Sequence, residues 1–386
     1  MNLKTLAKSK IKPGAKVLMR IDCDVPLKAG RIQKGSTWRL ERAIPDICDL
    51  TSRGAIVILV GHLGRPNGKV VKNLSLAPIS KWLASEKKIK NVFTGEVIGK
   101  KTTNIVNQAK PGSVVMLENV RFSDREEKDC KKFAHKLAAL ADIYVNNAFG
   151  TCHRKHSSVH RITELLPSYA GSVLVEEVGE LSKKMPKPLT LLVGGAKLET
   201  KIPLIKVMAG KAQTVLIGGG LALVFHEAAT GVPLKMKGKI ISASEVKIAK
   251  NILKKFDNIK LPIDYVDSNG KKIHAADLNG AHSIVDIGLK TARDFADKLK
   301  KSKTVIFNGA MGIVEIAGGK EGTIITTRAF AGNKKVRSIV GGGDTVAFVQ
   351  AEGIEKKFSF LSTGGGAMLA FLASEKLPGL EVLWKL

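Results

Sequence analysis

Short apolar runs rich in β-branched residues alternate along the chain with longer stretches whose apolar residues recur every three or four positions. Most of the runs are continuously apolar, as expected for strands buried on both faces of a parallel sheet. Nine runs are predicted as strands: residues 17–21, 56–60, 114–117, 143–145, 189–193, 214–217, 283–287, 304–307 and 337–340. The alternation predicts an α/β protein with right-handed strand–helix–strand crossovers.

The helical period is clearest in four stretches, at residues 126–141, 164–184, 244–255 and 290–301. Ser123 with Glu126 has the spacing of a capping box, in which serine and glutamate satisfy backbone donors at a helix start. Ser242 with Glu245 has the same spacing. We therefore expect helices to begin beside both serines, and helices on both faces of doubly wound sheets.

A chain of 386 residues exceeds what one hydrophobic core usually supports, and it fits two domains of about 150–200 residues each. The dipeptide pairs Met185-Pro186 and Lys187-Pro188 form an extended break after the predicted helix at 164–184. The predicted organisation is a first domain over residues 1–163, a joining helix and linker over 164–188, a second domain over 189–365 and a tail over 366–386.

Composition narrows the class of protein. Hydrophobic residues make up 44% of the chain and aromatic residues 5%, as in folded, aliphatic-rich α/β proteins. No apolar run reaches the ~20 residues needed to span a bilayer, and residues 1–16 lack the hydrophobic block of a secretory signal. The four cysteines are scattered without a CxxC pair, which indicates reduced thiols. We expect a cytoplasmic protein without a membrane segment.

The formal net charge of +29 is unusually high. Such a field attracts nucleic acid, and it equally steers small polyanions into a cleft. The lysines are spread over predicted helices without interleaved aromatic residues, which favours a solvated basic surface. We therefore expect contact with nucleic acid only as a secondary, charge-driven interaction.

Polar segments follow the predicted strands of the first half. They read Asp22-Cys23-Asp24, GHLGRP at 61–66, ENVR at 118–121 and NNAFGTCHRKH at 146–156. Ligands of parallel sheets bind beyond the carboxyl ends of the strands. One polar residue there is usually a helix cap, but three of these segments carry an arginine, and converging guanidinium groups bind phosphate or carboxylate through charge-assisted hydrogen bonds. The sequence predicts a site for an anionic ligand.

Glycine-rich segments follow strands of the second half, at 194–197, 218–220, 308–312 and 341–345. Glycine allows close backbone approach, and a helix that begins there aims N–H donors at phosphate. The last segment adds Asp344, a candidate Mg²⁺ ligand, and Thr345, whose hydroxyl can reach a phosphate oxygen. Lys197 and Lys201, four residues apart, share one helix face. No segment fits GxxxxGK[ST] or GxGxxG, so we predict a nucleotide-phosphate site of another type.

Two further patterns leave alternatives open. His153, His156 and His160 have a spacing that can bind zinc on a helix, but the basic residues between them would repel a cation. Asp22 and Asp24 can form an acid/base pair, bind a hydroxyl group or orient an arginine.

Taken in order, these segments resemble the phosphoglycerate kinase family across nearly the whole chain. The segments that carry the resemblance are RIDCDVP at 20–26, GHLGRP at 61–66, LENVRF at 117–122, VNNAFGTCHRKH at 145–156, GGAKLETKI at 194–202, residues 217–220, NGAMGIVE at 308–315, VGGGDT at 340–345 and STGGG at 362–366. Each is only moderately specific by itself, whereas nine in the family's order leave little room for another family.

The resemblance implies a fold and an activity. The fold is two Rossmann-like, doubly wound domains joined by a helix, in a bilobed kinase that closes about a hinge, with the tail packed on the first domain. The activity is reversible phosphoryl transfer from 1,3-bisphosphoglycerate to MgADP, which gives 3-phosphoglycerate and MgATP in glycolysis and gluconeogenesis. The triose phosphate binds the first domain and the nucleotide the second. Mg²⁺ is the implied cofactor, and we expect a monomer.

The resemblance also implies residue roles. Asp22 and Asp24 meet the hydroxyl and carboxyl end of 3-phosphoglycerate. A basic patch surrounds its phosphate and the transferring group, and it consists of Arg39, His62, Arg65, Arg121 and Arg154.

On the nucleotide side, Lys197 and Lys201 bridge the phosphates, Asn308 helps place the nucleotide and Glu315 binds its ribose. The phosphates and Mg²⁺ are held by Gly342, Gly343, Asp344 and Thr345, with Asp344 as the metal ligand. Arg39, Lys197 and Lys201 are the expected catalytic residues.

The chain departs from the family's usual residues at five positions: Asp24 for Asn, Asn147 for Asp, Phe307 for Trp, and Leu289 and Ala310 for Pro. None removes a phosphate-binding arginine, a lysine or the Mg²⁺ aspartate. The departures therefore bear on affinity and pH profile more than on reaction type.

Two other functions compete with this one. The first is a basic, non-enzymatic nucleic-acid-binding protein that kept a kinase-like fold, against which the retained basic and magnesium positions argue. The second is a phosphotransferase acting on another carboxyl phosphate, which the arginine and histidine patch alone does not exclude.

Overall fold

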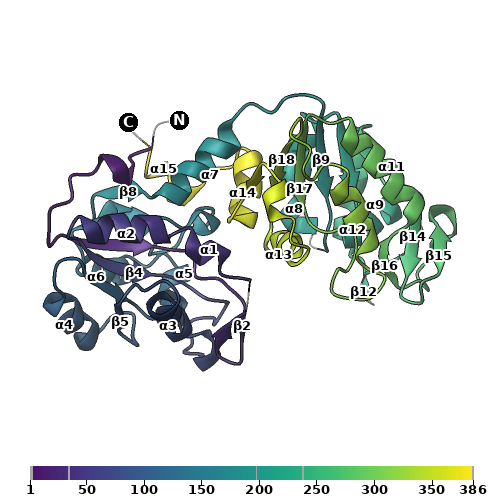
Figure 1. The fold of residues 1–386 in the computed structure, drawn as a ribbon. Helices are drawn as coiled ribbons and strands as arrows, with labels where there is room; N and C mark the ends of the chain where they lie inside the picture. The colour runs from purple at the N-terminus through teal and green to yellow at the C-terminus, as the bar shows by residue number, and fades with distance from the viewer. Residues whose placement is uncertain (1–2, 34, 197, 237–238, 385–386) are drawn as a thin grey trace. The chain divides into compact units, whose positions relative to one another are not determined.

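The computed structural model describes residues 3–33, 35–196, 198–236 and 239–384 and divides into two compact units (Figure 1). The first unit is Met1–Leu181 with Lys376–Leu386, and the second is Ser182–Glu375. Residues 164–181 thus belong to the first unit and residues 366–375 to the second, whereas the sequence pattern assigns them to the linker and the tail. No described helix is both long and apolar enough to cross a membrane.

The first unit is built on a six-stranded sheet whose pairings are all parallel. In spatial order its strands are β5 (Asn91–Phe93), β6 (Val114–Met116), β4 (Ile56–Val60), β1 (Lys16–Arg20), β7 (Ile143–Asn146) and β8 (Ser168–Ala170). The second strand of this sheet in chain order, β4, lies on one side of β1, and the later strand β7 lies on the other. The winding direction therefore reverses between β1 and β7, where ligands of open α/β sheets bind.

Helices cover both faces of this sheet, as the continuous apolar strands require. The main helices are α2 (Ile44–Ser52), α3 (Ala77–Ser85), α4 (Lys100–Gln108) and α6 (Lys131–Ala138). Side chains alternate across a strand, so Val17 and Met19 of β1 pack with α2 and α3, whereas Leu18 packs with α4 and α6.

The second unit has its own six-stranded parallel sheet. Its strands are β13 (Ile259–Lys260), β10 (Thr214–Ile217), β9 (Leu189–Val193), β17 (Thr304–Asn308), β18 (Arg337–Val340) and β19 (Phe360–Leu361). Counted along the chain, this is the Rossmann order 3-2-1-4-5-6, and it reverses between β9 and β17. The accompanying helices are α8 (Leu198–Ala209), α9 (Gly219–Thr230), α10 (Ala243–Lys255), α11 (Leu289–Lys300), α12 (Glu321–Arg328), α13 (Gly343–Ala351) and α14 (Gly365–Leu372). The predicted α/β class with two parallel-sheet units is confirmed.

Smaller elements complete the two units. The second unit carries an antiparallel sheet of β15 (Lys272–His274), β14 (Asp264–Asp267) and β16 (Ile284–Ile287), so the strand predicted at 283–287 is antiparallel and lies outside the main sheet. The remaining short elements are β2 (Leu27–Lys28), β3 (Arg31–Ile32), α1 (Trp38–Glu41), β11 (Lys235–Met236), β12 (Lys239–Ile240) and α15 (Pro378–Glu381).

Two predicted helices are wrong in extent. The stretch 164–184 contains the end of a 3₁₀ turn, η5 (Arg161–Glu164), then β8, and only then α7 (Ser172–Ser182). Pro167 has no N–H to donate and interrupts the helix, and the chain after it pairs with β7.

The stretch 126–141 likewise splits into α5 (Asp124–Glu127) and α6, with Asp129 between them at a positive φ of 50°. The Ser123 side chain accepts a hydrogen bond from Arg125 N, but Glu126 does not complete the capping box because its carboxylate turns inward. The capping box of Ser242 and Glu245 is confirmed.

Candidate functional site

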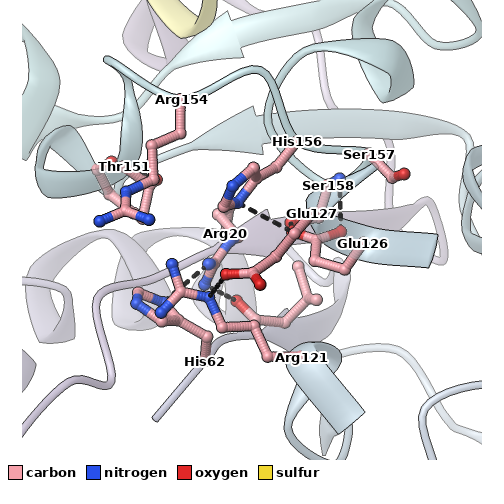
Figure 2. A network of polar contacts seen from close by, with 12 residues as sticks. Arg20, His62, Arg121, Glu126, Glu127, Thr151, Arg154, His156, Ser157 and Ser158 are labelled. Atoms are coloured by element: carbon pink, nitrogen blue, oxygen red, sulfur yellow. Dashed lines mark hydrogen bonds and ion pairs between the residues drawn. The ribbon is translucent and has the colours of Figure 1, made fainter. Parts of the chain in front are cut away.

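Four neighbouring strands of the first sheet, β6, β4, β1 and β7, end beside one another, and each is followed by polar residues. Arg20 ends β1, His62 comes two residues after β4, Arg121 follows β6 and Arg154 lies in the segment after β7. The carboxyl ends of parallel strands lie along one edge of a sheet. Figure 2 shows these four basic side chains gathered at that edge.

Arg20 and His62 form the buried centre of the cluster. Arg20 Nη2 lies 2.9 Å from His62 Nδ1, and Arg20 Nη1 donates to the Ile21 and Val60 carbonyl oxygens at 2.9 and 3.4 Å. Burial holds the pKa of His62 well below its ordinary value, and the positive charges of Arg20 and Arg121 lower it further. The imidazole is therefore neutral at physiological pH.

Asp22 and Asp24 are tied into the turn after β1. Asp22 Oδ1 accepts from Asp24 N at 3.1 Å, and Asp24 Oδ1 accepts from Gly64 N at 3.0 Å. Arg39, on α1, donates through Nη1 to the Asp24 carbonyl oxygen at 3.2 Å. Burial raises the pKa of Asp22. The positive charge of Arg39 opposes this increase, and the negative charge of Asp24 adds to it. Each carboxylate accepts a hydrogen bond from a backbone N–H, and the Arg39 guanidinium lies beside them.

Arg121 fixes the loop after β4 from the other side. It lies in the 3₁₀ turn η3 (Val120–Phe122), whose start is capped by Asn119 Oδ1 accepting from Arg121 N at 3.1 Å. Its Nη1 donates to Gly64 O at 2.8 Å, and its Nε lies 3.1 Å from Glu127 Oε1. Gly64 has a φ of 61°, and a Cβ there would lie 2.8 Å from Leu74 Cδ2. Burial lowers the pKa of Arg121 to about 10, still well above neutral pH.

The segment after β7 adds Arg154 and two histidines. Arg154 Nε donates to His153 Nε2 at 3.2 Å. Burial and neighbouring arginines lower the pKa of His153 to about 4 and that of His156 to about 3, so both rings are neutral. Behind them the buried Glu126 carboxylate accepts from Ser158 N at 3.0 Å and Ser158 Oγ at 2.6 Å (Figure 2).

The three histidines do not form a zinc site. His160 Nδ1 lies 2.9 Å from Asp129 Oδ2, while His156 Nδ1 lies 3.8 Å from Glu126 Oε1. Within the described residues, no three His, Cys, Asp or Glu side chains are grouped so as to hold a metal ion. Arg65 is exposed, and no hydrogen bond or ion pair is found for it in the described part of the chain.

The glycine segments of the second unit contact one another through their backbones. Gly194 N donates to Asn308 O at 3.1 Å, and Gly219 N donates to Met311 O at 2.8 Å. Gly309 has a φ of 100°, and a Cβ on it would lie 2.2 Å from Gly194 O. A side chain on Gly309 would collide with the backbone of Gly194. Only glycine therefore lets the segment after β17 pass this close to the segment after β9.

The start of α13 closes onto this cluster. Asn308 Nδ2 donates to Gly341 O at 2.7 Å, and Gly309 N donates to Thr345 Oγ1 at 2.7 Å. Gly342 precedes the helix with a φ of 101°, and a Cβ on it would lie 3.1 Å from Asn308 Nδ2. The first turn of α13, from Gly343, therefore faces the glycine turns with unpaired backbone donors, which is a geometry that binds phosphate.

Two charged residues accompany these turns. Burial lowers the pKa of Lys201, on α8, to about 8, and the nearby carboxylate of Asp344 opposes this decrease. Asp344 itself is exposed in the first turn of α13. Glu315 is exposed in the loop after β17. Lys197 lies outside the described residues, so its predicted position stays a prediction.

The departures from the family pattern have distinct structural settings. Asn147 Oδ1 accepts from Val173 N at 2.9 Å in the first turn of α7, so it serves as a helix cap. Phe307 is buried in β17 and packs edge-on against Phe330, with ring centroids 6.2 Å apart. Ala310 is buried, and Leu289 is 40% exposed at the start of α11.

A family model described as "Phosphoglycerate kinase" matches residues 9–375. The chain belongs to the phosphoglycerate kinase family. A phosphoglycerate kinase from Trichodesmium erythraeum (strain IMS101) is 37% identical and covers 98% of each chain. The solved phosphoglycerate kinase structures from Coxiella burnetii and Pyrococcus horikoshii OT3 are each 30% identical, cover 99% of this chain and 98% of theirs, and have TM-scores of 0.80 and 0.85.

Two residues of this phosphoglycerate kinase site are absent from the set predicted on the sequence. Arg20 carries a signal, because a charged residue ends an otherwise apolar strand and must find partners at the strand end. For Glu126 the sequence pattern predicts the wrong partner, because its spacing from Ser123 is that of a capping box. Its actual partner, Ser158, is 32 residues away and is found only in the folded chain.

Proposed function

We propose that the chain acts as a phosphoglycerate kinase, a transferase that moves a phosphoryl group reversibly from 1,3-bisphosphoglycerate to MgADP. The products, 3-phosphoglycerate and MgATP, are those of glycolysis, and the reverse direction serves gluconeogenesis. The observation that carries the proposal is the set of basic side chains at four adjoining strand ends, of which Arg20, His62 and Arg121 are buried and Arg154 is half-buried. Guanidinium groups supply the bidentate, charge-assisted hydrogen bonds that phosphate and carboxylate accept.

We assign the triose phosphate to this edge of the first unit. Asp22 and Asp24 orient its hydroxyl and carboxyl end. Arg39, His62, Arg65, Arg121 and Arg154 surround its phosphate and the group that is transferred. The position of Arg39 beside the Asp22–Asp24 turn supports this assignment, because its guanidinium offsets the negative charge of that turn.

We assign the nucleotide to the glycine turns of the second unit. Gly342, Gly343 and Thr345 provide donors for its phosphates at the start of α13, Asn308 braces that turn, and Glu315 binds the ribose. Lys201 and, by the family pattern, Lys197 bridge the phosphates and the moving group. The direct bonds from Asn308 to Gly341 and from Gly309 to Thr345 support a preformed phosphate cradle.

The residues present fit a magnesium ion that arrives with the nucleotide. Asp344 is the single exposed carboxylate in the first turn of α13. Mg²⁺ commonly takes one or two carboxylates together with substrate phosphates and water, so a cage of acidic residues is not required. When bound, the ion neutralises negative charge on the phosphate oxygens.

The acyl phosphate is already activated, so catalysis needs positioning and charge stabilisation rather than general acid/base chemistry. Arg39 and Lys201 supply positive charge to the equatorial oxygens of the transferring group. The neutral His62, His153 and His156 fit this scheme because none of them has a pKa near neutral pH, as a general base would require.

A coupled assay tests the proposal. Purified protein receives MgATP and 3-phosphoglycerate, and NADH oxidation is followed through glyceraldehyde-3-phosphate dehydrogenase. We expect turnover that Lys201→Ala abolishes and that Lys206→Ala, at an exposed lysine on the same helix, preserves. Absence of turnover from folded protein that still binds MgATP would contradict the proposed acceptor.

A further inference from the structure

The contact between Arg20 and His62 has only one possible direction. A guanidinium group carries five N–H donors and no acceptor. Arg20 Nη2 lies 2.9 Å from His62 Nδ1, so Nδ1 must accept the hydrogen bond. The neutral ring then carries its single proton on Nε2. The one hydrogen bond that the described residues make to the His62 ring is at Nδ1, so Nε2 remains available as a donor.

The Arg20 guanidinium is held rigidly. Its Nη1 donates to Ile21 O, in the residue after β1, and to Val60 O, the last carbonyl of the neighbouring strand β4. The side chain is fully buried, with 0% exposure. These two strand-end carbonyls fix the plane of the guanidinium, so Nη2 is directed at the histidine.

The side chains that, together with burial, lower the pKa of His62 are basic. They are Arg20 from β1, Arg121 from η3, and Arg154 and His156 from the segment after β7. The buried carboxylate of Glu126 accepts hydrogen bonds from Ser158, and its charge interacts with those of Arg20 and Arg121. Protonation of the histidine ring, which would add one more positive charge to this cluster, is therefore disfavoured both by burial and by its neighbours.

We propose that Arg20 is a positioning residue that locks His62 in the neutral tautomer protonated at Nε2, so that the ring donates from Nε2 to the anionic group of the substrate. The identity of that anion as the triose phosphate rests on the proposed function. The tautomer itself does not, because every contact that sets it lies within the protein.

This arrangement separates substrate binding from proton uptake by the histidine. A free histidine has an ordinary pKa of about 6.5, and its affinity for an anion would increase as the pH falls through that value. A ring locked by Arg20 offers the same N–H donor across the range from pH 5.5 to 8. Binding of the substrate at His62 is then independent of pH in this range.

The test is long-range ¹H–¹⁵N NMR of the ¹⁵N-histidine-labelled full chain, with His62 identified by its absence in His62→Gln. We expect Nε2 to carry the proton and Nδ1 to be unprotonated throughout pH 5.5 to 8, with and without 3-phosphoglycerate. A ring protonated on Nδ1, or on both nitrogens at neutral pH, overturns the proposal. This measurement needs no substitution of Arg20, so a variant that fails to fold does not prevent it.

The role of Arg20 is tested with Arg20→Met, which removes the donor and keeps an unbranched apolar side chain. We expect His62 to populate both tautomers and to titrate at a higher pKa, and the KM for 3-phosphoglycerate at neutral pH to increase about tenfold. kcat/KM for 3-phosphoglycerate should now rise as the pH falls, at a higher pH than any such rise in the wild-type protein. An unchanged His62 spectrum in folded Arg20→Met overturns the role of Arg20.

Arg53→Met is the matched control, because Arg53 also donates to a backbone carbonyl, Ser9 O, at 2.6 Å. Arg53 follows the last residue of α2 and lies outside the basic cluster. It should leave the His62 signals unchanged. Should the wild-type tautomer be as expected while the protein lacks turnover with 3-phosphoglycerate, the proposed function fails and the tautomer assignment stands.

Discussion

The two units place their candidate sites at the same topological position and use different chemistry there. In the first unit, the strands that flank the reversal between β1 and β7 deliver arginine and histidine side chains. In the second, the strands that flank the reversal between β9 and β17 lead into glycine turns, and the neighbouring strand β18 leads into the start of α13. In the proposed assignment, one anion is thus met mainly by long side chains, and the other mainly by backbone amides.

The difference has physical consequences. Side-chain recognition requires charged groups to be buried, so Arg20 and Arg121 need carbonyl and carboxylate partners to hold them. Backbone recognition requires no buried charge but leaves no room for a Cβ, as at Gly309. We therefore expect the first site to fail when a charge is removed, and the second when a methyl group is added.

The largest effect should come from removing charge in the first unit. Arg39→Ala takes away a guanidinium that we assign to the transferring group, and kcat should fall by about 10²–10³-fold. Arg42→Ala is the control, because Arg42 follows the same short helix but is paired with Glu176. Stopped-flow or steady-state assays of both variants decide this, and a normal kcat for Arg39→Ala would remove its assigned role.

Adding a methyl group should damage the second unit next most severely. In Gly309→Ala the new Cβ would lie 2.2 Å from Gly194 O, and we expect a loss of about 3 kcal/mol in the free energy of unfolding, together with loss of MgADP binding. Gly353→Ala also has a positive φ, 64°, but meets nothing within 4 Å, so it should cost only about 1 kcal/mol. Equal urea midpoints for the two variants would contradict the close-approach argument.

A smaller effect concerns pH and Lys201, the half-buried lysine proposed for the second site. Because burial lowers the pKa of Lys201 to about 8, the side chain is charged below this pH and loses its proton above it. We expect kcat/KM for MgATP, which reports the free enzyme, to fall about tenfold per pH unit above this value. An active Lys201→Arg variant should keep its activity at high pH, since guanidinium does not titrate there. A profile that is identical in both proteins would exclude Lys201 as the titrating group.

The smallest effect tests the extra negative charge of the first site. Asp24→Asn keeps an oxygen acceptor for Gly64 N and removes a charge beside an anionic substrate. We expect the KM for 3-phosphoglycerate to fall about threefold, and the pKa of Asp22 to decrease because Asp24 raises it. Asp49→Asn, at an exposed aspartate on α2, serves as the control and should leave the KM unchanged.

Much of the fold follows from local patterns. Continuous apolar runs such as 56–60 and 189–193 predict buried parallel strands because both faces of such strands lack water. The ends of helices are harder to predict from sequence than the strands. Pro167 and the positive φ of Asp129 interrupt two stretches whose periodicity alone predicts one helix each. The candidate arginines and glycines were identifiable because they directly follow strands, where ligands of parallel sheets bind.

By itself the sequence determined the strands, the α/β class, the family and most of the residues at the two strand-end clusters, since these depend on residue type and spacing along the chain. Only the tertiary structure decided which side chains meet. The bonds of Arg20 to His62, of Glu126 to Ser158 and of Gly309 to Thr345 join residues 32 to 42 positions apart. Such pairs depend on strand order and register, which local propensity does not encode, because long-range packing rather than sequence spacing brings the partners together.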